Sequence, residues 1–109
     1  MVDFKDILSK CRGFQWYTGN LEKNWLKHRV SRLEIEQVFF NRPLLVAFDD
    51  QHSQEEQRFF ALGRTEFGRN LFMVFTVRHD LIRVISARDM SRRERKVYED
   101  AKEEEYSKV

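Results

Sequence analysis

The sequence predicts an α+β protein, with two N-terminal helices and one C-terminal helix packed on a small antiparallel four-stranded sheet, plus one short N-terminal strand. Three observations predict this fold. Helical apolar periodicity with a capping box precedes Pro43, strand-like apolar segments with short links follow it, and a second capping box opens a charged C-terminal stretch. The 109 residues fit one domain, which we expect over residues 13–109, with residues 1–12 as an N-terminal extension.

The N-terminal third is predicted to contain a short strand and a helix. Residues 13–17 form an aromatic run typical of a strand, and residues 20–28 place Leu21 and Trp25 one helical turn apart. A short helix is also expected in the extension, from apolar residues that share one helical face: Phe4, Ile7, Leu8 and Cys11.

The next helix has the clearest local signature in the chain. Ser31 can cap it, and Glu34, three residues later, can close a capping box. Leu33 and Val38 are then expected to face the core. Pro43 ends the segment, because proline cannot continue a helix and disfavours helical geometry in the residue before it.

The second half of the chain predicts four strands and a last helix. The strands are expected at residues 44–48, 57–65, 70–78 and 81–88. Links as short as His79–Asp80 favour antiparallel hairpins. The strand at 70–78 is apolar on both faces, which predicts a central position. Ser91 and Glu94 form the second capping box, which opens a helix to about Tyr106.

Charge is distributed unevenly along the chain. The net charge is only +2, but Arg78–Lys96 holds seven basic and three acidic residues, a local balance of +4. Residues Glu99–Glu105 hold five acidic residues and one lysine, a balance of −4. Such asymmetry informs on partners more than on fold.

The last helix reverses the order of charges that its dipole favours. Basic residues crowd its first turns, where acidic ones are stabilising. One interpretation is a solvated face with i,i+4 pairs such as Arg95–Glu99 and Lys96–Asp100, worth only about 0.2–0.5 kcal/mol each. The other is a surface that binds an anionic partner.

Arg83 and Arg88 lie in or at the end of an apolar strand, where a guanidinium needs an anion or a carboxylate. Strict alternation places them on opposite faces. An internal ion pair with Glu94 or Asp89 is one explanation, and a phosphate pocket is the other. Arg64 and Arg78, near the ends of the neighbouring strands, could extend the basic surface.

The remaining chemistry-bearing residues are few. His28 ends a predicted helix, where it is either a helix-end cation or a proton-transfer group. Metal-ligand spacings, a glycine-rich phosphate loop and a nucleophile elbow are absent from the sequence, so we expect no metal and no cofactor. With Cys11 as the only cysteine and no apolar run near 20 residues, we expect a soluble, cytoplasmic protein without a membrane partner.

A set of residues spread along the chain forms a recognisable pattern. They are Phe14, Trp16, Asn24, Lys27, His28, Leu62, Gly63, Arg64, Ile82, Arg83, Ile85, Ser86, Ala87, Arg88, Glu94, Arg95 and Tyr98. This pattern resembles that of the BrnT toxins, the toxin halves of bacterial BrnT/BrnA toxin–antitoxin modules with a RelE-like fold. The resemblance covers residues 14–106. It departs from the family pattern at Tyr17-Thr18, where Asp-Pro is usual, and at Arg29, where glycine is usual.

The resemblance implies a metal-independent ribonuclease that cleaves mRNA, inhibits translation and is neutralised by a cognate BrnA-like antitoxin. A heterotetramer that binds operator DNA through the antitoxin is implied as well. RelE-like chemistry, in which the ribose 2′-hydroxyl attacks the adjacent phosphate, needs cations together with a base and an acid. We assign catalysis to His28, Arg64, Arg83 and Arg88, and substrate binding to Lys27, Arg78, Ser86, Arg92, Arg95 and Tyr98.

Two other interpretations fit the same residues. The chain could be a non-catalytic basic module that binds an acidic protein or nucleic acid, or the arginines could chiefly dock the antitoxin, since arginine is enriched in interface hot spots. Lys27 and Tyr98 are alternatives to His28 for proton transfer. Metal-independent cleavage of RNA distinguishes the enzyme from the binding module.

Overall fold

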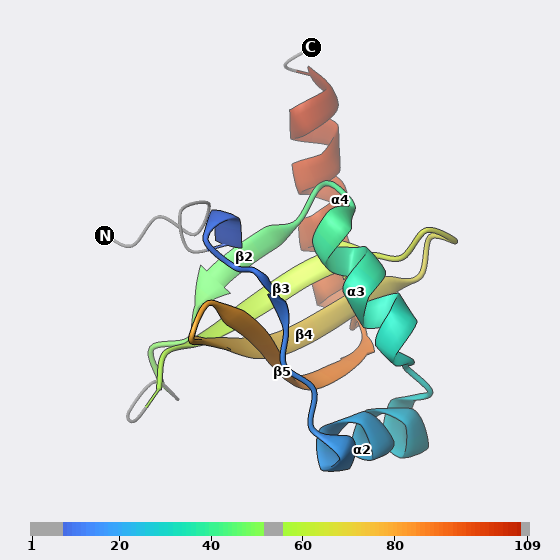
Figure 1. Ribbon diagram of the computed structural model, residues 1–109. Coiled ribbons are helices and arrows are strands. Elements are labelled where there is room, and N and C mark those ends of the chain that lie inside the picture. The colour runs from blue at the N-terminus through green and yellow to red at the C-terminus, as the bar shows by residue number, and fades with distance from the viewer. Residues whose placement is uncertain (1–7, 52–55, 108–109) are drawn as a thin grey trace.

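The computed structural model describes residues 8–51 and 56–107, with side chains described as far as residue 104, and it has one five-stranded sheet and three helices (Figure 1). The predicted leading helix falls mostly on residues outside this range, and of it Leu8 and Ser9 are helical. The elements in chain order are β1 (Gly13–Phe14), α2 (Thr18–His28), α3 (Arg32–Phe40), β2 (Leu45–Phe48), β3 (Arg58–Arg64), β4 (Asn70–Arg78), β5 (Leu81–Asp89) and α4 (Arg92–Ser107).

The sheet has the order β1-β5-β4-β3-β2, so β4 is the central strand, as its apolar character predicted. The pairs β2–β3, β3–β4 and β4–β5 are antiparallel, and the short β1 adds to β5 in parallel. The hairpin between β4 and β5 turns at His79 and Asp80, both at positive φ (54° and 62°). Two consecutive residues of this kind match the twist of a two-residue hairpin.

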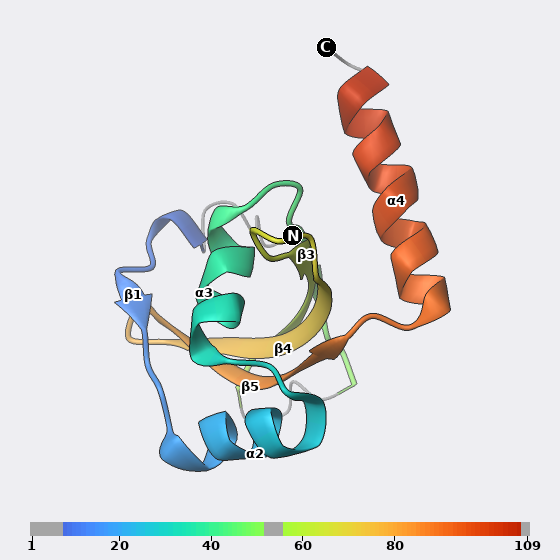
Figure 2. The same cartoon turned by 90° about the vertical axis from the view of Figure 1, so that its right-hand side faces the viewer.

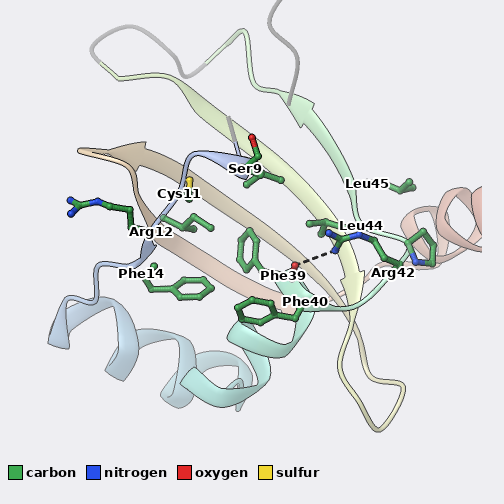
Figure 3. Close-up of a pocket in the computed structure, with 13 residues that line it drawn as sticks. Ser9, Cys11, Arg12, Phe14, Phe39, Phe40, Arg42, Leu44 and Leu45 are labelled. Atoms are coloured by element: carbon green, nitrogen blue, oxygen red, sulfur yellow. Dashed lines mark hydrogen bonds between the residues drawn. The ribbon is translucent and has the colours of Figure 1, made fainter. Parts of the chain in front are cut away.

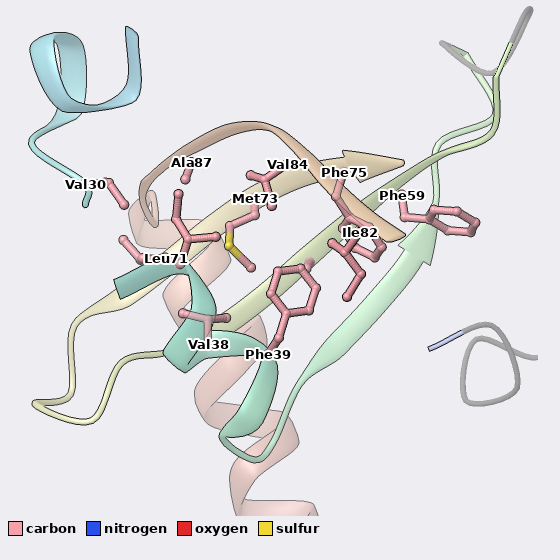
Figure 4. Close-up of a cluster of buried hydrophobic side chains, with 12 residues drawn as sticks. Val30, Val38, Phe39, Phe59, Leu71, Met73, Phe75, Ile82, Val84 and Ala87 are labelled. Carbon is pink, nitrogen blue, oxygen red and sulfur yellow. The ribbon is translucent and has the colours of Figure 1, made fainter. Parts of the chain in front are cut away.

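Helix α3 covers one face of the sheet, and the hydrophobic core lies between them (Figure 4). Ser31 and Glu34 form the predicted capping box at its start. Val38 and Phe39 are buried on the sheet, with the Phe39 ring edge-on to Phe75 at 5.2 Å. The expectation that Leu33 faces the core is wrong, because its side chain is 64% exposed.

Helix α2 runs beside β5, beyond the point where β1 stops pairing (Figure 2). Asn24 is buried, and its side-chain oxygen accepts a hydrogen bond from the Ala87 amide at 3.2 Å. Asn20 donates to the Val84 carbonyl at 3.4 Å. Two asparagine side chains thus satisfy backbone groups at an edge that would otherwise be exposed.

Helix α4 lies on the side of the sheet opposite α3 and extends away from the body (Figure 2). Its predicted capping box is present, since the Ser91 amide donates to Glu94 and the Glu94 amide donates to Ser91 Oγ. Tyr98 anchors the helix: its side chain is fully buried, and its hydroxyl donates to the Pro43 carbonyl at 2.6 Å. Lys96 and Asp100 form one predicted i,i+4 pair at 3.7 Å.

Candidate functional site

The face of the sheet that α3 leaves uncovered, called here the arginine face, is rich in basic residues. Cross-strand register and alternation define it, and apart from Thr76 its side chains are half-exposed. It comprises Arg58, Phe60, Leu62 and Arg64 on β3, Phe72, Val74, Thr76 and Arg78 on β4, and Leu81, Arg83, Ser86 and Arg88 on β5.

A β-bulge brings Arg83 and Arg88 to the same face. Val84 pairs with Phe75 and Ser86 pairs with Val74, so Ile85 is the extra residue of β5. Alternation resumes one residue later, and the prediction that Arg83 and Arg88 lie on opposite faces is therefore wrong. Ser86 lies between them on this face.

At one end of the arginine face, a single carboxylate holds two arginines. Arg78 donates to Glu56 Oε2 from Nε at 3.0 Å and from Nη2 at 2.7 Å, and Arg83 Nη1 lies 3.5 Å from Glu56 Oε1. The Arg83 guanidinium also stacks on Tyr17, 4.3 Å from the ring centroid. Hydrogen bonding and the charge of Glu56 raise the pKa of Arg78. Neither Glu56 nor Tyr17 was assigned a functional role from the sequence.

Two polar atoms in this region have no hydrogen-bond partner among the described residues. They are Arg83 Nε and Thr76 Oγ1, both buried, on residues that are direct cross-strand partners. Because an unpaired buried polar atom is costly, such atoms mark places where water or a ligand group binds. The pair therefore adds binding capacity beneath the arginines.

Arg88 is at the other end of the face, where α4 begins. It makes two hydrogen bonds to Glu94, at 2.8 and 3.0 Å, and its guanidinium lies 4.2 Å from the centroid of the Phe72 ring. The Phe72 ring packs beside Phe60 at 5.5 Å. The hydrogen bond from Arg88 lowers the pKa of Glu94 despite its partial burial. The predicted ion pair with Glu94 thus exists, for Arg88 but not for Arg83.

The other predicted phosphate ligands are more scattered. Arg64 ends β3 on the arginine face, with Nη2 donating to the Arg42 carbonyl at 3.1 Å. Arg92 and Arg95 are exposed in the first turn of α4 and form no ion pair with another described residue. The buried Tyr98 lies inside the fold, and its hydroxyl is engaged by Pro43.

Lys27 and His28 are exposed in the last turn of α2. Among the described residues, neither side chain is in contact with Arg64 or Arg83. The His28 charge acts on Asp89, at the end of β5, and the Asp89 carboxylate is also near Arg95. The structure therefore groups His28 with the β5–α4 junction and not with Glu56.

Arg69, which no local pattern in the sequence marks, organises this junction. It donates to Asp89 at 2.7 Å, to Glu34 at 3.0 Å, and to the carbonyls of His28 and Arg29 at 2.9 and 2.8 Å. Its hydrogen bond lowers the pKa of Asp89. At Glu34, burial raises the pKa, but hydrogen bonds from Ser31 and Arg69 outweigh it, so the pKa is lowered.

Arg29 itself adopts the left-handed conformation that ends α2 (φ 53°, ψ 40°), the geometry that glycine favours at this position. The turn after α2 therefore keeps a glycine-like shape although the residue is arginine. The strain is modest, because a single left-handed residue costs about 1–2 kcal/mol.

A separate cavity of about 670 Å³ lies on the α3 side of the sheet (Figure 3). Its lining is mainly apolar and includes Phe14, Phe39 and Phe40. None of the residues assigned to catalysis or substrate binding lines it. The apolar cavity and the arginine face are thus distinct surfaces.

Among residues 8–51 and 56–107, no group of three or more His, Cys, Asp or Glu residues is arranged to hold a metal ion. In the same residues, no helix has the length and apolar content needed to cross a membrane.

The arginine face combines guanidinium groups, which bind phosphate, with half-exposed aromatic rings, on which nucleobases can stack. Comparison with known proteins agrees with this chemistry. No curated protein matches the chain significantly. Residues 16–94, however, match a family described as "Ribonuclease toxin, BrnT, of type II toxin-antitoxin system". This match spans most of the chain, from Trp16 to the first turn of α4, and the protein therefore belongs to the BrnT family of ribonuclease toxins, whose partners are an RNA substrate and a cognate antitoxin.

Proposed function

We propose that this ribonuclease binds mRNA on the arginine face and cleaves it without a metal, which blocks translation. The observation that carries the proposal is the gathering of five arginines and two aromatic rings on one half-exposed face of the sheet, in a chain of the ribonuclease toxin family. Guanidinium groups at fixed positions can stabilise the negative charge that develops on phosphorus when a 2′-hydroxyl attacks it.

Within this proposal, Arg83 and Arg88 bind phosphates of the RNA, with Arg64 and Arg78 at the ends of the neighbouring strands. The spacing supports this division. The partners of Arg83 and Arg88 on β4 are Thr76 and Phe72, four residues apart. At about 3.4 Å per residue this is roughly 14 Å, so the two arginines engage different phosphates.

His28 is the proposed proton-transfer group, with Lys27 beside it, since an imidazole changes protonation near neutral pH. Its side chain is exposed, and its charge acts on Asp89 at the end of β5, a carboxylate that Arg95 also influences. Tyr98, by contrast, has a structural position, and we leave it out of the proposed reaction.

The test of the catalytic proposal uses Arg83→Ala and Arg88→Ala. We expect each to lower the rate of RNA cleavage by about 10²–10³-fold, the usual effect of removing one group that stabilises a developing anion. The assay follows labelled single-stranded RNA in EDTA and identifies 2′,3′-cyclic phosphate ends. Growth arrest on expression should weaken in parallel.

Arg32→Ala is the matched control, because Arg32 lies on α3, on the opposite side of the sheet, in an exposed pair with Glu36. It should cleave RNA at the wild-type rate. Full activity of both test variants at matched thermal stability would contradict the site assignment. Loss of wild-type activity in EDTA would contradict metal independence.

For the antitoxin, we propose a complex of two toxins and two BrnA-like antitoxins that binds operator DNA through the antitoxin. The observation in its favour is family membership. Co-expression with the antitoxin and measurement of the molar mass by light scattering, with and without operator DNA, tests it. A stable complex of any other stoichiometry would contradict it.

A further inference from the structure

We propose that Arg78 and Arg83 form a phosphate subsite that the free toxin fills with its own Glu56, so that an RNA phosphodiester must displace this carboxylate in order to bind. The inference rests on the proposed function of the arginine face and extends it, because it names a residue that sets RNA affinity by competing with the substrate.

The first argument is the geometry of the pair. One Glu56 carboxylate oxygen accepts two hydrogen bonds from Arg78, at 2.7 and 3.0 Å, while the other lies 3.5 Å from Arg83. Two oxygens thus span two guanidinium groups. A phosphodiester presents two equivalent anionic oxygens, and arginine binds carboxylate and phosphate through the same planar fork. Glu56 therefore occupies the position that a phosphate would take.

The second argument is that Glu56 satisfies the subsite incompletely. Its contact with Arg83 is long, and Arg83 Nε remains without a partner among the described residues, as does the cross-strand neighbour Thr76 Oγ1. Two positive charges face one negative charge. A phosphodiester carries more acceptor oxygens than a carboxylate and can engage the Arg83 guanidinium more fully, so replacement of Glu56 by phosphate is favourable.

The third argument is that a phosphate can reach the subsite from solvent and that few contacts hold the Glu56 carboxylate there. The side chains of Arg78 and Glu56 are 40% and 31% exposed, so a phosphate can approach from solvent. Glu56 lies outside any helix or strand, and within the described residues its carboxylate accepts hydrogen bonds from Arg78. The comparison is Glu94, which pairs with Arg88 but is also fixed by Ser91 in the capping box of α4. Glu56 can leave at low cost, whereas Glu94 cannot.

Tyr17 completes the subsite. Its ring stacks on the Arg83 guanidinium at 4.3 Å and is 37% exposed. Stacking keeps the guanidinium in place when the carboxylate leaves, and the rest of the ring can contact the nucleotide. The ligand class that fits is therefore single-stranded RNA, with a phosphate between the arginines.

The experiment measures binding of a fluorescent, 2′-O-methylated single-stranded RNA, which lacks the attacking hydroxyl, by anisotropy over a series of salt concentrations. We expect Glu56→Gln and Glu56→Ala to bind about fivefold more tightly than wild type, the factor that corresponds to one exposed ion pair. The slope of log affinity against log salt should steepen by up to about 0.7, the value for one phosphate contact on a single strand, because the variants release no carboxylate that takes up a counterion when the phosphate binds.

Glu36→Gln is the matched control, because it removes the same charge from an ion pair on α3 (Arg32–Glu36, 3.2 Å), on the opposite side of the sheet. Its affinity should stay within twofold of wild type. Arg83→Ala is the second reference and should weaken binding. If both Glu56 variants bind like wild type, or more weakly, while Arg83→Ala weakens binding, the inference about Glu56 is wrong, but the proposal that RNA binds on the arginine face still holds. If Arg83→Ala leaves RNA affinity unchanged, both the inference about Glu56 and the proposed RNA binding on the arginine face are wrong.

Discussion

At the scale of single residues, the largest structural role belongs to Arg69. One guanidinium joins the end of α2, the start of α3 and the end of β5 through Glu34, Asp89 and two backbone carbonyls. It is partly exposed, which limits the value of each contact, but removing it takes away the donor to the Asp89 carboxylate, to one oxygen of Glu34 and to two carbonyls.

We therefore expect Arg69→Ala to lower the free energy of unfolding by about 2 kcal/mol. Lys96→Ala, which removes an exposed i,i+4 pair with Asp100, should change it by less than about 0.5 kcal/mol. Urea unfolding at pH 7 gives both values. An effect of Arg69→Ala as small as that of the control would show that the junction does not depend on this residue.

The same pairs predict how stability depends on pH. In the folded protein Arg69 holds the pKa of Glu34 and of Asp89 below their ordinary values of 4.5 and 3.8. The unfolded chain then takes up protons first as the pH falls, so this part of the stability is present above about pH 5 and is lost at lower pH. The difference between wild type and Arg69→Ala should accordingly shrink at pH 3.5. If the difference in unfolding free energy were the same at pH 7 and pH 3.5, Arg69 would stabilise the protein through packing and not through its charge.

At the scale of elements, α3 approaches the sheet closely at Gly63. A Cβ at this position would collide with Val38 Cγ1 and crowd Leu44. The glycine of the Leu-Gly-Arg motif thus lets the helix approach β3, and its role is in packing. This position decides how tightly the helix layer sits on the strands.

Gly63→Ala is expected to destabilise the protein by about 1–3 kcal/mol, because the helix must shift or Val38 must leave its preferred position. Gly19→Ala is the control: it lies in α2, with nothing within 4 Å of an added Cβ, and should raise stability by about 0.5–1 kcal/mol. Thermal unfolding compares the two. Equal effects would mean that backbone freedom, and not the collision, governs Gly63.

The elements themselves were largely predictable, because their signals are local. Both capping boxes, the central β4 and the short β4–β5 turn follow from neighbouring residues. The site was less predictable. Arg69 and Glu56 act across 20 or more residues of sequence, and no local pattern marks them. The Arg88–Glu94 pair was predicted, but the common face of Arg83 and Arg88 and the Glu56 carboxylate beside Arg78 and Arg83 were not.

At the scale of the whole molecule, the two faces of the sheet differ in charge. Arg58, Arg64, Arg78, Arg83 and Arg88 share one face of the sheet, whereas the face that α3 covers is apolar. The acidic end of α4 extends away from the body on the side of the arginine face (Figure 2). A net charge of +2 therefore understates the field that RNA meets.

For the whole molecule we expect a marked salt dependence of RNA binding. Contacts with three or four phosphates predict a slope of about −2 to −3 in log affinity against log salt for a single strand. Anisotropy titrations of wild type between low and physiological salt measure it. A slope near zero would rule out the arginine face as the principal RNA contact, whatever the affinity.

The bulge at Ile85 has a consequence for how this segment can change in evolution or by design. Between Arg83 and Arg88 the number of residues, more than their identity, decides which way the second guanidinium points. Deletion of Ile85 would remove the bulge, because Val84 and Ser86 would then follow each other opposite Phe75 and Val74, and Arg83 and Arg88 would stay on one face of a regular strand. A residue added or lost without a matching change in the bulge would instead turn Arg88 into the apolar interior and bring Ala87 out to solvent.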